Sequence, residues 1–186
     1  TTHQLMQEMD LKDISIRKIA SKMNCSPGLI YHYFKDKNEI INGILLLKYQ
    51  EMNHQLKQVI QKDLDPLECF EASLKTFIHG ILNQGKAYME MMSSDHEDIL
   101  RHTKVLYKGV SREKPGFKMM VDQITMITGL DETTSEYIGQ IIWSSTFGLL
   151  YRMHIERCDQ KQQQHLIDFH VKYHMEALNH YRKVKT

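Results

Sequence analysis

Apolar residues recur three and four positions apart along most of the chain, which is the spacing of one face of an α-helix. The clearest stripe runs through residues 67–81, and others run through residues 40–47, 117–127 and 166–181. No convincing stretch alternates apolar and polar residues between turn residues, as a half-buried strand would. The pattern therefore predicts an all-α protein.

Capping and turn residues predict where the longer helices begin and end. At each expected helix start, a residue that can cap the helix is followed by an acidic residue three positions later or by a proline in the first helical turn. We expect starts at Asp36–Glu39, Asp65–Glu68 and Thr133–Glu136, and a more polar helix from Ser94 toward Gly109. A break at residues 114–116, the end of a helix at Gly129 and a polar turn at residues 156–162 complete the outline.

The first 35 residues have shorter elements. Residues 1–9 have the pattern of the end of a helix, Ser15 can cap a helix from Ile16 to Met23, and Ser26 can cap one that Pro27 opens and Phe34 ends. Two helices of about eight residues joined by a tight turn are typical of a helix-turn-helix. Such short helices need neighbouring helices to cover their apolar residues.

Charge is concentrated in the same segment. The formal net charge of all 186 residues is only +1. Between Ser15 and Lys37, however, five basic residues face one acidic residue, a local charge of +4. Local positive charge is what contacts to DNA phosphates require, and a solvated helix face is the alternative. Charge and helix-turn-helix spacing coincide, which favours DNA binding.

Other compositional features narrow the class of protein. Cys25, Cys69 and Cys158 are odd in number and widely spaced, so we expect a reducing, cytoplasmic location and no disulfide framework. No apolar run is long enough for a membrane span, and the first residues do not resemble a signal peptide. Since the chain begins with Thr1, we expect it to start inside its gene product, with the first helix truncated.

Residues 14–37, ISIRKIASKMNCSPGLIYHYFKDK, carry a run of ordered, ungapped matches to one family. Over roughly residues 5–50 the chain strongly resembles the tetracycline-repressor (TetR) family of bacterial transcription regulators. The matching hallmarks are Ser15, Ile19-Ala20, Ser26, Gly28, Tyr31, Tyr33-Phe34 and Lys37. Asp10 and Asn24 stand where glycine is frequent, and both residue types tolerate a left-handed conformation. Phe147 replaces the histidine of the Trp-x-x-x-His-Gly run that some relatives carry.

This resemblance implies an organisation and a function. The expected fold is an N-terminal three-helix DNA-binding domain with a helix-turn-helix, residues 1–48, followed by a larger helical effector-binding and dimerisation domain, residues 49–186. The expected function is that of a sequence-specific transcriptional repressor, released from an inverted-repeat operator by a small apolar or aromatic ligand. The alternative is a relative that acts as a co-activator or as an adaptor for a protein partner.

The resemblance also implies roles for individual residues in DNA binding. The N-terminal end of the second short helix would enter the major groove, with base edges near Pro27, Gly28, Leu29 and His32. Leu29 and Pro27 would meet thymine methyls, and His32 would donate to a purine. The remaining residues of the expected DNA-binding set would contact phosphates, and Arg17 could contact a guanine instead. They are Ser15, Arg17, Ser26, Tyr31, Tyr33 and Lys37. For Tyr31 the alternative is packing in the core.

A homodimer and an unidentified small-molecule effector are the expected partners besides double-stranded DNA. The dimer would pair the last two helices, about 133–154 and 163–183, through Ser144, Ser145, Gly148, Tyr173, Ala177, Leu178 and Tyr181. The effector pocket would be lined by Tyr88, Met91, Met92, Phe117, Met120, Trp143, Phe147 and Tyr151. For both sets the alternative is packing within one subunit, and for any single pocket residue this is the favoured interpretation.

A metal site or an enzyme is the remaining alternative. His170 and His174 lie one helical turn apart, which is a spacing that metal ligands use, but no glutamate follows His170 as in zinc proteases. The sequence has no nucleophile elbow, phosphate-binding glycine loop or Cys-x-x-Cys pair. We therefore expect a protein that is not an enzyme and needs neither a metal nor another cofactor.

Overall fold

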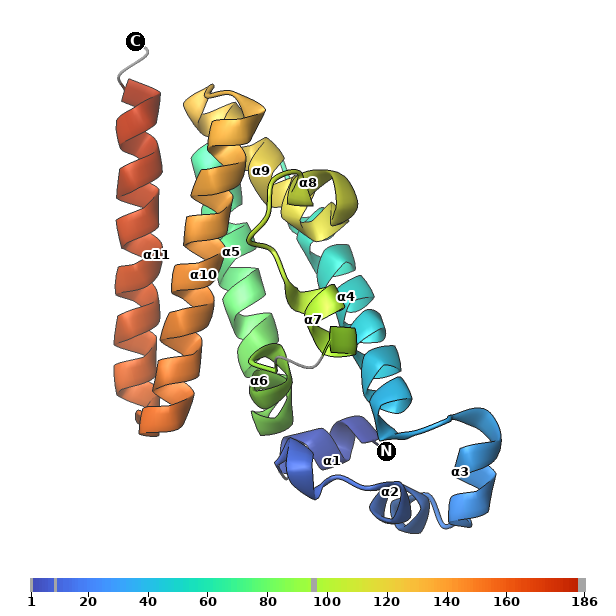
Figure 1. The fold of residues 1–186 in the computed structure, drawn as a ribbon. Helices are drawn as coiled ribbons and strands as arrows, with labels where there is room; N and C mark the ends of the chain where they lie inside the picture. Colours follow the sequence, from blue (N-terminus) through green and yellow to red (C-terminus); the bar gives the residue numbers. More distant parts are fainter. Residues whose placement is uncertain (1, 9, 95–96, 184–186) are drawn as a thin grey trace. The chain divides into compact units, whose positions relative to one another are not determined.

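The structure is a computed structural model that describes residues 2–8, 10–94 and 97–183 (Figure 1). The described residues form helices joined by turns, without a strand, so the all-α prediction is confirmed. The elements are α1 (Thr2–Glu8), the 3-10 turn η1 (Leu11–Asp13), α2 (Ile16–Lys22), α3 (Pro27–Tyr33), α4 (Lys37–Ile60), α5 (Pro66–Leu82), α6 (Lys86–Met92), α7 (Glu97–Thr103), α8 (Val110–Glu113), α9 (Pro115–Thr128), α10 (Glu132–Glu156) and α11 (Gln160–Lys183). Within the described ranges, none of these helices is both long and apolar enough to cross a bilayer.

The chain forms two compact units, and each is discontinuous in sequence. Unit 1 contains residues 1–51 and 80–104, and unit 2 contains residues 52–79 and 105–186. The sequence suggests one continuous division after residue 48. The structure instead groups α6 and α7 with the N-terminal helices, because α6 packs against α1 and η1.

Unit 1 surrounds one apolar cluster. Its buried side chains come from α1, the segment before α2, α2, α3, α4 and α7: Leu5, Ile14, Ile16, Ile19, Ala20, Ile30, Ile40, Ile41, Leu45 and Ile99. This cluster supplies the tertiary packing that seven-residue helices need, since helices shorter than about 12 residues are marginal in isolation. Asp10 directly precedes η1, and its carbonyl accepts the Asp13 amide at 3.0 Å.

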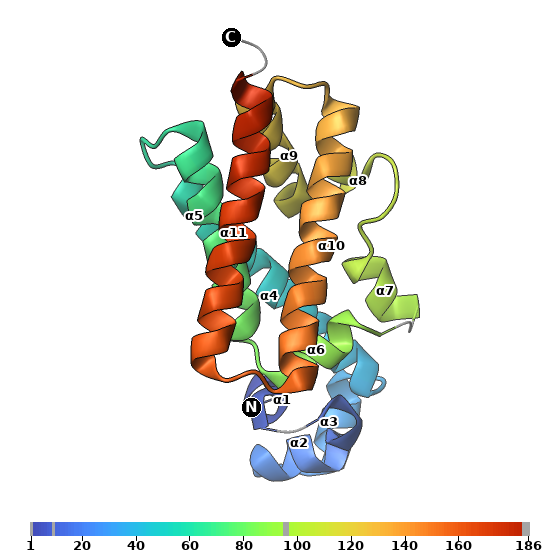
Figure 2. The same ribbon diagram turned by 90° about the vertical axis from the view of Figure 1, so that its left-hand side faces the viewer.

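Unit 2 contains a pair of long antiparallel helices, α10 and α11, which lie side by side (Figures 1 and 2). Helix α9 packs against both of them. At Gly139 of α10 an added Cβ would lie 3.3 Å from Met120 and 3.4 Å from Phe117, so the absent side chain lets α9 and α10 approach closely. The N-cap of α10 is Asp131, two residues before the expected Thr133, and its carboxylate accepts the Thr134 amide at 3.0 Å.

Two polar side chains of α10 hold the segment that the sequence predicts as the end of a polar helix. Gln140 donates to the Val105 and Tyr107 carbonyls at 3.0 and 2.9 Å. The Glu136 carboxylate accepts from the Gly109 amide at 2.7 Å and from the Ser111 amide and hydroxyl at 3.0 and 2.6 Å. Burial raises the pKa of Glu136, but the bonds from Ser111 and Gly109 outweigh burial and lower it overall. Helix α7 therefore ends at Thr103, and the Glu136 carboxylate of α10 accepts the amides at the start of α8.

The two histidines with metal-ligand spacing connect α11 to α10 instead. His170 Nε2 lies 2.8 Å from Thr146 Oγ1, and His174 Nε2 lies 3.1 Å from Ser145 Oγ. Burial and the neighbouring His170 lower the pKa of His174 to about 4, and burial lowers the pKa of His170. In the described part of the chain, no group of three or more His, Cys, Asp or Glu residues is arranged to hold a metal.

Acidification is expected to destabilise unit 2 through His174. In the unfolded chain His174 is protonated below its ordinary pKa of 6.5, whereas in the folded chain it stays neutral down to about pH 4. The free energy of unfolding therefore falls as the pH drops from about 6.5 to about 4. Replacing His174 with Gln should flatten the pH dependence of the free energy of unfolding by about 2 kcal/mol. Urea unfolding between pH 7 and 4 measures this, with the exposed His165→Gln as control. Equal slopes for wild type and H174Q contradict the assignment.

Candidate nucleic-acid interface

Helices α2 and α3 meet in a tight turn that is closed by backbone hydrogen bonds. The Cys25 amide donates to the Ala20 carbonyl at 3.0 Å, and the Asn24 amide donates to the Ser21 carbonyl at 3.1 Å, which together form a Schellman motif. Asn24 adopts the left-handed conformation that this motif requires, with φ of 53°. The turn thus ends α2 sharply and positions the start of α3.

Side chains cap both short helices. The Ser15 hydroxyl accepts the Lys18 amide at 3.3 Å, and the Ser26 hydroxyl accepts the Leu29 amide at 3.2 Å. Pro27 follows Ser26 in the first turn of α3, where a missing N–H costs nothing. The expected capping roles of Ser15, Ser26 and Pro27 are therefore confirmed.

Helix α3 is attached to unit 1 through a single buried side chain. Ile30 is 5% exposed, whereas every other residue of the helix is exposed. Tyr31 and Tyr33 are 57% and 70% exposed, so the alternative that Tyr31 packs in the core is wrong for this structure. The helix presents nearly its whole surface to solvent.

The face opposite Ile30 consists of Gly28 and His32. Successive residues of an α-helix advance by about 100°, so Gly28 and His32 each lie about 160° from Ile30, with Leu29 and Tyr31 at their flanks. A Cβ built on Gly28 would meet only the Ser26 hydroxyl oxygen, at 3.8 Å. Nothing in the fold therefore requires glycine here, although glycine weakens a helix relative to alanine.

The start of α4 lies two residues after Phe34 and has its own cap. The Asp36 carboxylate accepts the Glu39 amide at 3.0 Å, and the Glu39 carboxylate accepts the Lys35 amide at 2.6 Å. This is the predicted capping box, with Glu39 reaching one residue further back than the usual pattern. Lys37, the first residue of α4, is half-buried at this site.

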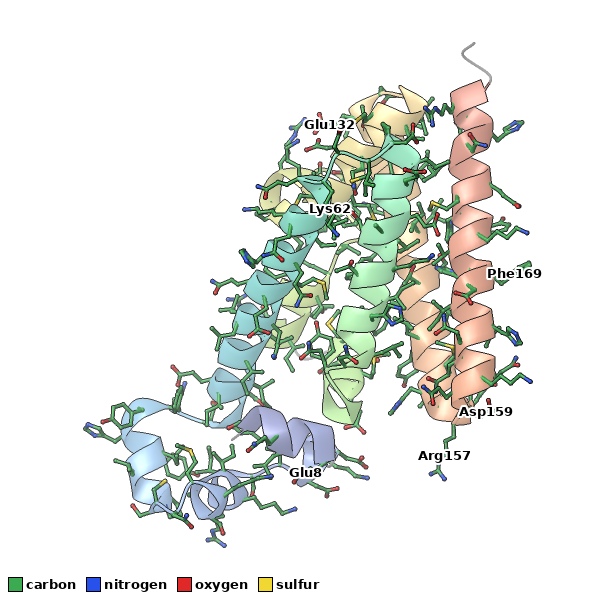
Figure 3. The ribbon with its side chains drawn as sticks, turned by 180° about the vertical axis from the view of Figure 1, so that it is seen from behind. Glu8, Lys62, Glu132, Arg157, Asp159 and Phe169 are labelled. Atoms are coloured by element: carbon green, nitrogen blue, oxygen red, sulfur yellow. The ribbon has the colours of Figure 1, made fainter. Side chains whose placement is uncertain are left out.

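Basic side chains are exposed on α2, the helix that packs against α3. Arg17 and Lys18 are exposed in the first turn of α2, and Lys18 is a candidate that the sequence argument missed, although it contributes to the same charge cluster. The charge of Lys22 is compensated, because its ammonium lies 2.7 Å from the carboxylate of Glu8 in α1. Figure 3 labels Glu8. The ten expected DNA contacts thus lie at three helix starts and along α3, and all belong to unit 1.

The residues predicted to line an effector pocket fall in both units. Tyr88 and Met92 pack against the unit 1 cluster, and burial raises the pKa of Tyr88 to about 12. The side chain of Met91 lies outside the described residues. In unit 2, Trp143 stacks on Phe147 with centroids 5.4 Å apart, and Phe147 stacks on Tyr151 at 6.3 Å. Phe117, Met120 and Trp143 belong to one apolar cluster of this unit.

The residues predicted for a dimer interface lie on α10 and α11, and most are accessible. Ser145, Gly148, Tyr173, Ala177 and Tyr181 are exposed and Ser144 is partly exposed, whereas Leu178 is only 1% exposed and belongs to the core of unit 2. Further large apolar residues are exposed on the same two helices: Tyr137, Ile141, Ile155 and Phe169. These four residues lie at helical spacing from the predicted interface residues, and that spacing is the feature of the sequence that indicates them.

Comparison with known proteins agrees with this geometry. Residues 1–44 match the family described as "Bacterial regulatory proteins, tetR family". The chain is also 29% identical over 91 residues to the HTH-type transcriptional regulator BetI of Cronobacter sakazakii (strain ATCC BAA-894). That alignment covers 48% of this chain and 43% of the relative, so the chain matches less than half of the relative's length. Residues 1–44, with their capped helix-turn-helix, are thus similar to the tetR family of bacterial regulatory proteins.

Proposed function

We propose that this chain is a sequence-specific DNA-binding transcriptional regulator that represses from an inverted-repeat operator and is released by a small ligand. The observation that carries the proposal is α3, a capped helix whose side chains are exposed except for Ile30. Exposed apolar and aromatic surface on a short helix is costly in water, and a major groove is wide enough to receive such a helix. The family match adds support for this assignment. A DNA-binding regulator of this kind would work in the bacterial cytoplasm, as a binding protein without catalysis.

Electrostatics and helix starts support binding to the phosphate backbone. Arg17 and Lys18 are exposed next to the first turn of α2, and Lys37 begins α4, where amide groups at a helix N-terminus also attract phosphate. Phosphate contacts set register and most of the affinity, whereas side chains on the outer face of α3 would read base edges.

Selective binding to duplex DNA is the test of the proposal. Selection from a random duplex library should enrich an inverted repeat with half-sites about 34 Å apart, bound with a Kd below about 1 µM. Affinity should fall by orders of magnitude between about 50 and 200 mM salt, because bound phosphates release their counterions. Fluorescence anisotropy across a salt series measures both. If no sequence is enriched, the proposed function is wrong.

Three substitutions test separately the phosphate contacts, the base contacts and the close backbone approach of the proposed DNA interface. Lys37→Ala should weaken binding to all sequences alike and make the salt dependence shallower, whereas His32→Ala should also relax sequence preference. Gly28→Ala should leave thermal stability equal or higher, since its Cβ has open space and alanine favours helix, yet weaken binding because the backbone can no longer approach DNA closely. A G28A variant that binds as tightly as wild type excludes close approach at this position.

A homodimer is part of the proposal, because one seven-residue helix reads few base pairs. The exposed apolar residues of α10 and α11 supply a surface for a second copy, and Phe169, 71% exposed, points outward from α11 (Figure 3). Gly148 lies on the same face of α10 as Ile141, and a Cβ there would meet nothing within 4 Å. A helical glycine with no packing role in one subunit is consistent with close approach of another.

Charge on this face should separate the subunits. Phe169→Glu should convert dimers to monomers at about 10 µM, and should lower affinity for the inverted repeat at least about tenfold, because one half-site is lost. Sedimentation velocity and anisotropy measure the two effects, and circular dichroism checks the fold. Met126→Glu on α9 is the matched control, since Met126 is 70% exposed. Dimers of F169E as stable as those of wild type contradict this interface.

We propose that the effector is a small apolar or aromatic molecule held near the Trp143–Phe147–Tyr151 stack of unit 2, since offset aromatic rings and methionine suit such ligands. A compound that raises the melting temperature, quenches Trp143 fluorescence and releases the selected duplex is the expected result of a screen. Phe147→Ala should reduce its affinity about tenfold. If every compound that stabilises the protein leaves DNA binding unchanged, ligand release is wrong and an adaptor or co-activator role is favoured.

A further inference from the structure

The last turn of α11 extends beyond the buried core of unit 2. Leu178 is 1% exposed and is followed by the partly exposed Asn179 and by the exposed His180, Tyr181 and Arg182. A helix end that extends past its buried residues frays easily, because its last carbonyls have no partner within the helix. The position of Tyr181 therefore depends on whether another contact holds this turn.

An ion pair between α11 and the start of α5 provides that contact. Arg182 donates from Nη1 to Asp65 Oδ1 at 3.0 Å and from Nη2 to Asp65 Oδ2 at 2.9 Å, so both arms of the guanidinium are engaged. Such a two-pronged pair fixes the orientation of both side chains as well as their separation. The two residues are 117 positions apart, and both belong to unit 2. The pair thus holds the last turn of α11 by a tertiary contact.

The carboxylate of Asp65 is itself held in place by α5. Its Oδ1 atom also accepts the Leu67 amide at 2.9 Å. Arg182 lies in the last turn of α11, where the helix dipole is negative, and Asp65 lies directly before α5, where the helix dipole is positive. The hydrogen bond from Arg182 lowers the pKa of Asp65, and Asp65 raises the pKa of Arg182. Both side chains are therefore ionised throughout the neutral pH range.

The ion pair also sets which way the last turn of α11 faces. Around the helix axis, Arg182 lies about 40° from the buried Leu178, and Tyr181 lies about 60° from Leu178 on the opposite side. Tyr181 is thereby turned toward the side of the helix that carries Ala177 and Tyr173, both of which are exposed. These residues belong to the proposed homodimer surface. Fraying or rotation of the last turn would move Tyr181 away from that surface.

We propose that Asp65 and Arg182 are positioning residues for the homodimer, because their ion pair orders the last turn of α11 before a second copy of the chain binds. This inference rests on the proposed homodimer and adds to it two charges that need not touch the second copy. Side chains that become ordered only on binding weaken association, whereas preorganised side chains do not. Since the pair lies at the surface, salt weakens the dimer through it.

A double-mutant cycle on dimerisation tests the proposal. Asp65→Asn loses the charge but keeps a side chain that can cap α5, and Arg182→Gln loses the guanidinium. Each should raise the Kd of the dimer about tenfold at low salt, since an exposed ion pair is worth a few-fold change and every dimer contains two. The double variant should be no weaker than either single variant, because the pair is already lost. Sedimentation velocity over a dilution series, without DNA, measures these constants.

Salt, a conservative variant and a matched ion pair serve as controls. The difference in Kd between wild type and R182Q should disappear at about 1 M salt, where the Debye length is about 3 Å. Arg182→Lys keeps the charge without the planar fork and should fall between them. On α9, Lys118 and Asp122 form a 2.8 Å pair whose side chains are 52% and 57% exposed, against 45% and 39% for Arg182 and Asp65. K118Q and D122N should leave the dimer unchanged.

The outcomes distinguish this inference from the proposed dimer. If F169E separates the subunits while R182Q and D65N dimerise as tightly as wild type, the ion pair has no positioning role although the dimer stands. If the effects of R182Q and D65N add in the double variant, or if K118Q weakens the dimer equally, the pair is not what orders the interface. If F169E and R182Q both leave the dimer intact, the proposed interface itself is wrong, and the inference with it.

Discussion

In α3, one buried side chain holds six exposed residues in position. Burial of Ile30 contributes about 2 kcal/mol, and among the described residues Ile30 is the member of the unit 1 cluster that comes from α3. A seven-residue helix has almost no stability of its own, so this anchor, the Ser26 cap and the turn at Asn24 together define its position. The outward face formed by Gly28 and His32 follows from where Ile30 points.

Because Ile30 is the one buried residue of α3, the other side chains of this helix do not contribute to the core. Leu29, Tyr31 and Tyr33 are exposed, and Gly28 has room for a side chain that it lacks. Each of these choices opposes stability in the isolated protein, because apolar surface stays in water and glycine loosens the helix. Local features that cost stability without a structural return are typical of binding sites.

Buried polar side chains add to the apolar core of unit 2. Glu136 and Gln140, one turn apart on α10, satisfy backbone groups between Val105 and Ser111 that would otherwise be buried without partners. His170 and His174 connect α11 to α10 by hydrogen bonds with the side-chain hydroxyls of Thr146 and Ser145. The spacing of the two histidines, which metal ligands also use, here places two ring nitrogens one helical turn apart so that each faces a hydroxyl of α10.

The sequence by itself determined the helical class, the two capped short helices, and the basic segment that surrounds them. These features depend on neighbours within four residues: Ser15, Ser26 and Asp36 bond to amides three positions on, and apolar spacing follows the helical repeat. Only the tertiary structure decided that Tyr31 is exposed, that Leu178 is core, and that the helix after residue 97 ends at Thr103. It also decided that α6 and α7 join unit 1. Each of these outcomes depends on contacts between residues far apart in sequence, such as the carboxylate of Glu136 at Gly109, and local spacing carries no record of such contacts.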